Sequence, residues 1–219
     1  MFSTIEELGL SAMSMGISPG ELALDVGFSW KRHMVVLTGD GIFHFFRDGM
    51  EVDPPDSLAD ISEISKWICD KRTGKVVVPS GVTSIGRKAF YGCTSLMSVI
   101  IPDSATSIGD WAFFSCTNLT SVTIPDGVTS IMEYAFSYCS GLTSVTIQSG
   151  VASIGGRAFY CCTNLTSVTI PDSVTSIGNE AFYGCIRLKS IIIIPRRFEN
   201  ELEKIDLVDL SKTKVSFSG

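Results

Sequence analysis

Apolar and polar positions repeat with a period of 23 residues through the middle of the chain. Across residues 76–190 the same order returns five times, and its shared frame is V-x-I-P-x-x-V-x-S-I-G-x-x-A-F-x-x-C-x-x-L-x-S. A fixed period in the twenties is typical of a stack in which each repeat forms one supersecondary unit. We therefore expect an elongated solenoid whose turns bury their apolar sides against one another.

Each repeat begins with a predicted strand and continues through a turn. In the third repeat Val122 and Ile124 alternate around Thr123, and Leu119 extends the pattern to L-x-x-V-x-I. This alternation predicts a short strand with one buried face. Pro125 has no backbone N–H, so strand pairing should end there. The apolar positions that follow are spaced for a tight coil or 3₁₀ turn on the convex side.

Two ladders of identical residues follow from the period. They are Phe90, Phe113, Phe136, Phe159 and Phe182, and Cys93, Cys116, Cys139, Cys162 and Cys185. Equivalent side chains in stacked turns point the same way, so neighbouring sulfurs should stay near the turn spacing of about 4.8 Å. A disulfide needs about 2 Å, and zinc needs converging ligands. We interpret the ladder as reduced, buried thiols and predict no metal site.

Two further cysteines fall outside this ladder. Cys161 stands where two other repeats have Gly92 and Gly184. Its side chain should face away from that of Cys162 as an exposed thiol; the favoured alternative is a tolerated replacement of glycine without a role. Cys69 follows an apolar stripe at helical spacing and is expected in the core.

The repeats resemble the leucine-rich repeats of the BspA-like or Treponema pallidum class, whose units read LxxVxIPxxVxxIGxxAFxxCxxL. The resemblance implies an α/β-type repeat solenoid, a right-handed coil with a parallel β-sheet on the concave face and short 3₁₀ or coil turns on the convex face. It also implies a secreted or surface-attached microbial protein. The first residues lack the basic start and apolar core of a signal peptide. Either a signal peptide has been removed, or the protein is cytoplasmic.

Residues 1–75 are predicted to form a non-repeat N-terminal cap of helix, β-hairpin and helix. Residues 34–37 and 42–46 flank a glycine-containing turn, which indicates the hairpin. Thr4 and Ser57 are predicted to begin the two helices.

Residues 191–219 are predicted to form a C-terminal strand and cap. Residues 191–194 continue the strand pattern, with Pro195 displaced by one residue from its place in the frame. A short helix over 198–205 and a last strand over 215–217 should cover the end of the stack.

Charge and composition exclude several partners. The net charge is −6, and residues 1–75 carry 12 acidic against seven basic residues. No basic stripe for nucleic acid is present, and no apolar run is long enough to insert into a membrane. We expect a monomer, or weak end-to-end association through an uncovered strand edge.

The sequence predicts no catalytic centre and no cofactor. His33 and His44 are the only histidines, and both precede the repeats. The many serines recur as ladders without histidine or aspartate partners at the same repeat position. Asn118 and Asn164 begin Asn-Leu-Thr triplets, which match a glycosylation acceptor but also suit the turn before each strand.

Two surfaces are candidates for binding a protein or glycan. Trp111, Tyr134 and Arg157 belong to the variable positions before each Ala-Phe pair, on the convex side. The alternative for these residues is an unconstrained convex face with stacked aromatic rings. The outward strand positions include Thr123, Thr146 and Thr169, on a flat face with few of the Trp, Tyr and Arg anchors that concentrate binding energy.

We therefore predict a non-catalytic binding protein. The family resemblance implies microbial surface adhesion or recognition of a host or matrix protein. The alternative is an intracellular interaction scaffold or effector. An enzyme with its site in residues 1–75 is the least favoured hypothesis.

Overall fold

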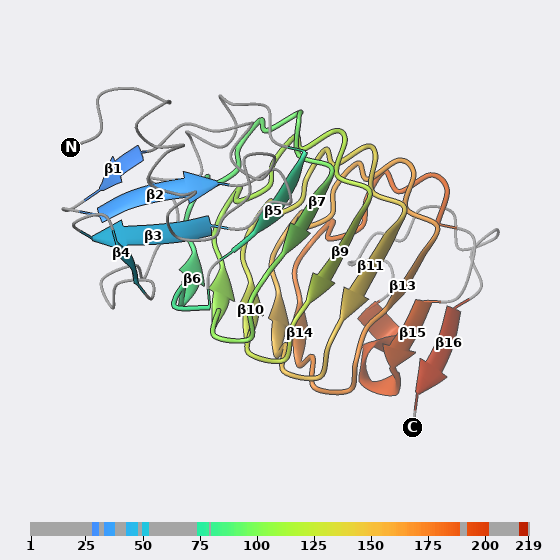
Figure 1. Ribbon diagram of the computed structural model, residues 1–219. Coiled ribbons are helices and arrows are strands. Elements are labelled where there is room, and N and C mark those ends of the chain that lie inside the picture. Colours follow the sequence, from blue (N-terminus) through green and yellow to red (C-terminus); the bar gives the residue numbers. More distant parts are fainter. Residues whose placement is uncertain are drawn as a thin grey trace.

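The computed structural model describes residues 28–30, 33–37, 43–47, 50–52, 74–78, 80–188, 192–201 and 215–218. From residue 74 to residue 188 the chain winds as a parallel β-solenoid (Figure 1). The helices predicted from Thr4 and Ser57, the side chains of His33 and His44, and Cys69 lie outside the described structure.

A seven-stranded sheet forms one side of the solenoid. Its strands, all parallel, are β5 (Lys75–Val77), β7 (Ser98–Ile100), β9 (Ser121–Ile124), β11 (Ser144–Ile147), β13 (Ser167–Thr169), β15 (Ile192–Pro195) and β16 (Val215–Ser218). Val145 lies opposite Val122, so the register is the sequence period of 23. In β9 and β11 the Val and Ile side chains are buried and the Ser and Thr side chains are exposed. The predicted strand in each repeat is therefore confirmed.

A second, five-stranded sheet forms the opposite side, where the sequence indicated only coil. Its strands are β6 (Ser84–Ile85), β8 (Ser107–Ile108), β10 (Ser130–Ile131), β12 (Ser153–Ile154) and β14 (Ser176–Ile177). Two residues are too few to show alternation, and they become a strand because Ile131 and Ile154 pair across neighbouring turns. The prediction was wrong here since this pairing is not a local property of the sequence.

Tight turns join the small sheet back to the large one. They match the coil alternative of the predicted coil or 3₁₀ turns. In each repeat two turn residues adopt a left-handed backbone. They are Lys88, Trp111, Tyr134, Arg157 and Glu180 at one position, and Gly92, Ser115, Tyr138, Cys161 and Gly184 at the other.

The left-handed residues let the turns bond to one another. The N–H of Trp111 donates to the carbonyl of Glu133 in the next turn at 3.0 Å, and the N–H of Ser115 donates to Ser137 at 2.9 Å. Each left-handed non-glycine residue costs roughly 1–2 kcal/mol. The conformation bends the chain sharply while aiming amides along the stack, so backbone groups that would otherwise be unpaired gain partners.

The core is continuous through the stack. The five ladder phenylalanines are fully buried. Their rings stack at 5.0 Å between Phe90 and Phe113, 4.9 Å between Phe113 and Phe136, and 5.3 and 5.2 Å for the next two pairs. The predicted phenylalanine ladder is confirmed.

The cysteine ladder is buried as predicted, but it also makes polar contacts. Cys116 Sγ donates to the carbonyl of Phe90 at 3.1 Å, and Cys139 Sγ donates to that of Phe113 at 3.0 Å. Cys162 and Cys185 repeat the contact. Burial raises the pKa of the Cys139 and Cys162 thiols well above their usual range. These cysteines therefore link neighbouring turns as weak donors as well as filling space.

Cys93 departs from the prediction of reduced thiols, because its sulfur is engaged in a disulfide. The spacing of stacked turns separates the sulfurs of neighbouring ladder members, but it places no limit on a bond from Cys93 to a cysteine outside the ladder. The four ladder cysteines from Cys116 to Cys185 are free.

Outside the repeats, four strands form an antiparallel sheet. They are β1 (Phe28–Trp30), β2 (His33–Leu37), β3 (Phe43–Arg47) and β4 (Met50–Val52), in that order. Val36 pairs with His44, which confirms the predicted hairpin. Strands β1 and β4 are additions to it.

At the other end, β15 follows β13 with Val168 opposite Ile192, a step one residue longer than the repeat. The displaced Pro195 signalled this change of register. The 3₁₀ helix η1 (Arg196–Glu201) overlaps the predicted short helix and contributes the buried Phe198. Strand β16 pairs with β15, as predicted for the last strand.

Candidate binding faces of the solenoid

The residues at the first left-handed position of each turn form a row across the stack, in which Lys88 is exposed and the other four are half-buried. We call Lys88, Trp111, Tyr134, Arg157 and Glu180 the mixed row, because its members differ in charge and size. The rings of Trp111 and Tyr134 stack with centroids 5.5 Å apart and planes 12° apart. The structure thus brings together the three residues that the sequence singled out on this side.

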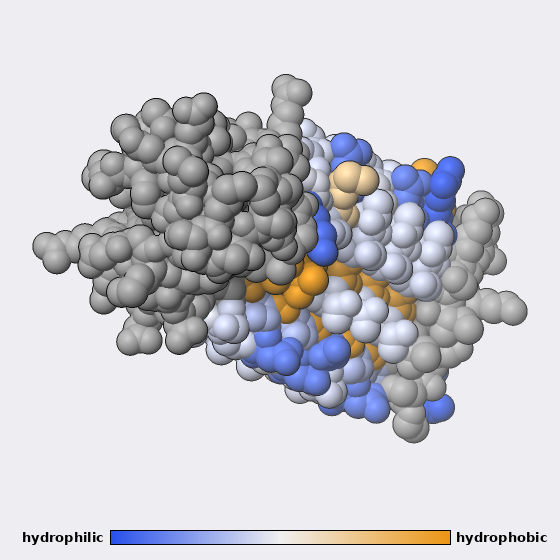
Figure 2. Space-filling model, in the orientation of Figure 1, coloured by the Kyte–Doolittle hydropathy of each residue, from blue (hydrophilic) through white to orange (hydrophobic). Residues whose placement is uncertain are grey.

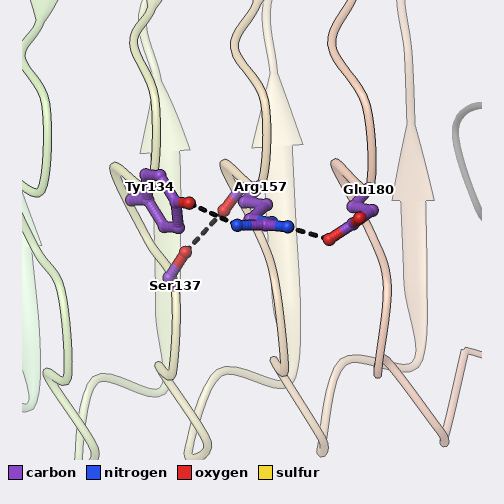
Figure 3. A network of polar contacts seen from close by, with 4 residues as sticks. All are labelled: Tyr134, Ser137, Arg157 and Glu180. Atoms are coloured by element: carbon purple, nitrogen blue, oxygen red, sulfur yellow. Dashed lines mark hydrogen bonds and ion pairs between the residues drawn. The ribbon is translucent and has the colours of Figure 1, made fainter.

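Arg157 holds the middle of the mixed row in place (Figure 3). Its Nη1 donates to the Tyr134 hydroxyl at 2.6 Å, and its Nε donates to Glu180 Oε2 at 2.6 Å. Buried Ser137 donates to the Arg157 carbonyl from below. The Arg157 guanidinium lowers the pKa of Glu180, so this carboxylate is ionised at neutral pH. Three successive turns therefore present a fixed phenol, guanidinium and carboxylate.

Cations also border the aromatic members of the row. Arg87 lies over the Trp111 ring at 4.9 Å, and Lys88 lies 5.7 Å from the same ring. Arg157 lies 5.6 Å from the Tyr134 ring. Each such contact at an exposed site contributes about 0.5–1 kcal/mol and limits the rotamers of a long side chain.

A second row of aromatic side chains runs beside the first. We call Tyr91, Phe114, Tyr138, Tyr160 and Tyr183 the aromatic row. Lys88 lies 5.4 Å from the Tyr91 ring and Arg157 lies 5.8 Å from the Tyr160 ring, so the two rows are neighbours. Together they form what we call the turn face.

The aromatic row is continuous although the sequence breaks it. Ser137 occupies the aromatic position in the third turn, but it is buried, and Tyr138 takes the exposed place. Tyr138 lies 5.3 Å from Phe114 and 5.5 Å from Tyr160, with its plane tilted by 59° and 57° to theirs. The other neighbouring rings in the row are stacked.

This geometry determines what the turn face can contact. Stacked rings cover each other's faces and expose edges and hydroxyls, whereas the tilted Tyr138 also exposes part of its ring face, with 45% of the residue accessible. Burial raises the pKa of the Tyr160 phenol, and nearby Cys161 raises it further. The phenol therefore stays protonated at neutral pH. The face offers apolar edges, hydroxyl donors and fixed charges.

The strand side offers different chemistry. Thr123, Thr146 and Thr169 are exposed and stand in register on β9, β11 and β13, away from the turn face. Figure 2 shows this side as pale residues beside an orange hydrophobic area, with blue residues gathered along its edges. We call it the sheet face. It has regular hydroxyls but few large anchors, as the sequence indicated.

Two other sequence features have structural explanations. Asn118 Nδ2 donates to the Thr94 carbonyl and Asn164 Nδ2 to the Ser140 carbonyl, both at 2.7 Å. The Asn-Leu-Thr triplets thus serve contacts between turns. Cys161 is half-buried rather than fully exposed, and its left-handed backbone explains why glycine occupies this position elsewhere.

The sequence missed two contributors to the turn face. Glu180 was not singled out from the sequence, although its spacing of 23 from Arg157 places it next in the row. Tyr138 was missed because it lies one residue off the aromatic frame. Among the described residues, no group of three or more His, Cys, Asp or Glu side chains is placed to hold a metal ion, and no helix is long and apolar enough to cross a membrane.

The stacked parallel strands and the buried Phe and Cys ladders together are consistent with a leucine-rich repeat solenoid. The family model for the BspA type leucine rich repeat region matches residues 67–206 in six copies. Because the match spans more than half of the chain, the protein belongs to this family. The sixth copy exceeds the five predicted repeats, and the match extends over β15 and η1.

The chain is also similar to solved structures. The leucine rich repeat protein of Treponema pallidum is 35% identical, with a TM-score of 0.54, over 57% of this chain and 62% of that protein. A leucine rich cell surface protein from Faecalibacterium prausnitzii A2-165 is 29% identical, with a TM-score of 0.46, over 75% of this chain and 54% of that one. The chain therefore spans less than two thirds of either relative. The comparison with curated proteins gives no match.

Proposed function

We propose that this protein is a non-catalytic binding protein that acts at a microbial surface, where it adheres to a host or matrix protein through the turn face. The observation that carries the proposal is the mixed row. It holds Trp111, Tyr134 and Arg157 together in a fixed arrangement at the surface. Trp, Tyr and Arg dominate the residues that contribute most to protein interfaces.

Rigidity supports the same proposal. The Arg157 side chain is already oriented by Tyr134 and Glu180, and the backbone beneath it bonds to both neighbouring turns. A partner binding here pays little entropy to order these side chains. Tyr138, with an exposed ring at the centre of the aromatic row, adds apolar area beside them.

The test measures binding of the full chain to a panel of immobilised extracellular-matrix proteins and host glycans. The triple variant Trp111→Ala, Tyr134→Ala, Arg157→Ala is compared with the matched control Thr123→Ala, Thr146→Ala, Thr169→Ala. We expect the turn-face variant to lose at least about 100-fold in affinity for a matrix protein, and the sheet-face variant less than about threefold.

Melting temperatures of both variants check that the fold is intact. Unchanged affinity in the turn-face variant, with loss in the sheet-face variant, would move the recognition surface to the strands. Absence of binding to every matrix protein would remove the adhesion proposal. Surface location is tested separately by protease treatment of intact cells of the source organism, which should degrade the protein without lysis.

A further inference from the structure

The mixed row is complementary to itself when it is read in reverse. Its order along the stack is cation, aromatic, aromatic, cation, anion, in the residues Lys88, Trp111, Tyr134, Arg157 and Glu180. Reversed, the row places Glu180 opposite Lys88, Arg157 opposite Trp111, and Tyr134 opposite itself. The first is an ion pair and the last an aromatic pair. Trp111 is already covered by Tyr134 and Arg87 on its faces, so it meets Arg157 of the reversed row with its edge only.

From this we infer that the turn face pairs two copies of the chain in an antiparallel homodimer. The inference rests on the proposed function only in treating the turn face as a protein-binding surface. A two-fold axis that lies in the contact plane, perpendicular to the stack, reverses the order of turns but keeps each row facing its own copy. Because of the two-fold symmetry, every contact between two different residue positions occurs twice in the dimer.

The spacing of the rows favours a second copy over an unrelated partner. Ring centroids along the aromatic row repeat at 5.0, 5.3, 5.5 and 5.2 Å. A ladder with this pitch stays in register over five turns only with a partner of the same pitch, and an identical solenoid supplies it. In the reversed arrangement Tyr91 meets Tyr183, Phe114 meets Tyr160, and the tilted Tyr138 meets itself.

Neighbouring positions fit the same arrangement. Asp110 precedes Trp111, and in the reversed pairing it faces the turn that holds Gly156 and Arg157. Gly156 has no backbone or side-chain atom closer than 3.5 Å to where a Cβ would lie, so this turn has open space as well as opposite charge for Asp110. Glu133 meets its own copy at the centre, which is the one like-charge contact among these pairs.

The existing hydrogen bonds leave capacity for these contacts. Arg157 uses Nε and Nη1 within its own chain, which leaves Nη2 to reach Asp110 of the second copy. Glu180 uses Oε2, which leaves Oε1 for Lys88. Pairing through the turn faces covers the surface that the proposed matrix ligand would use, so a second copy and the ligand compete for it.

Sedimentation velocity on the full chain tests the dimer by exchanging charges. In the Asp110→Lys dimer two cations meet at each contact between positions 110 and 157. In the Arg157→Glu dimer two anions meet there, so both variants make these contacts repulsive. An equimolar mixture of the two variants restores both contacts in a heterodimer. We expect the unmodified protein to dimerise below about 100 μM, each variant to weaken dimerisation at least tenfold, and the mixture to recover it.

A second pair of charge-exchange variants tests the dimer without changing Arg157, whose substitution could disturb folding. Lys88→Glu and Glu180→Lys should each weaken the dimer and should restore it when mixed, and Glu133→Gln alone should tighten it. A monomeric unmodified protein at about 100 μM, or mixtures that stay monomeric, would overturn the inference. If the protein is monomeric while the turn-face triple variant still loses its matrix ligand, the dimer fails and the proposed function stands. If the dimer forms but no matrix protein binds, the proposed function fails and the dimer stands.

Discussion

At the scale of single residues, the turns depend on backbone conformations that most side chains disfavour. Eight described non-glycine residues have φ between 53° and 59°. Glycine at positions 92 and 184 was the only sequence signal for this, because Trp, Tyr and Arg at the equivalent positions do not indicate a left-handed backbone. The conformation comes from bonding between turns, which a single repeat cannot reveal.

Ser115→Gly should stabilise the protein by about 1 kcal/mol, because it relieves a left-handed backbone at φ 57°. Ser140→Gly is the matched control. Ser140 does not have a left-handed backbone, so the extra conformational entropy that glycine gives the unfolded chain should destabilise the protein by a similar amount. Urea denaturation gives both values. Equal destabilisation by the two variants would contradict the turn geometry.

Native-state thiol titration should modify Cys161 first among the five cysteines that are free in the described part of the chain. Burial raises the pKa of its thiol, so the reaction should be slower than that of a free cysteine and should accelerate as pH rises. The four buried ladder thiols should react only after denaturant is added. Rapid modification of Cys139 in the folded protein would show that the ladder is open to solvent.

Glu180→Gln should lower the melting temperature slightly at about pH 7 and not at all at about pH 2. Arg157 lowers the pKa of Glu180 in the folded protein, so the stabilisation is present above the unfolded-state pKa and disappears as pH falls through the lowered value. Thermal melts of both proteins over this range measure the difference. A difference that persists in acid would assign the effect to packing.

At the scale of elements, the sequence pattern predicted the strands that a single repeat specifies and missed the strands that form only by pairing with neighbouring turns. The large-sheet strands follow from alternation around Val122 and Ile124. The strands of the small sheet, such as Ser130–Ile131, exist only through pairing across turns. For the same reason the period located Trp111, Tyr134 and Arg157 in one row, while the exchange of Ser137 for Tyr138 in the aromatic row was visible only in three dimensions.

Close packing between turns makes some glycines irreplaceable. A Cβ at Gly127 would lie 1.7 Å from the carbonyl oxygen of Asp103 in the preceding turn, whereas a Cβ at Gly92 meets no atom within 4 Å. Gly127→Ala should therefore cost more than about 3 kcal/mol or prevent folding, and Gly92→Ala only about 1 kcal/mol from its positive φ. Circular dichroism and urea titration compare the two. Similar costs would mean that the turns are not packed this closely.

At the scale of the whole molecule, each repeat contacts mainly its neighbours, and stability accumulates along the stack. Removing residues 122–144 deletes one complete period and joins Ser121 to Val145, which restores the strand pattern. That variant should fold cooperatively with a modestly lower melting temperature. Removing only residues 122–133 shifts every later ladder and should abolish folding. Equal behaviour of the two deletions would contradict the repeat architecture.

The central claim is that the turn face, and not the sheet face, is covered by protein partners. Hydroxyl-radical footprinting of the full chain, at increasing concentration and with a matrix protein that binds, measures this directly. We predict protection of Trp111, Tyr134 and Tyr138, while the exposed Ile100 of the sheet face keeps its reactivity. Protection of Ile100 with unchanged oxidation of those three aromatic residues would contradict the account.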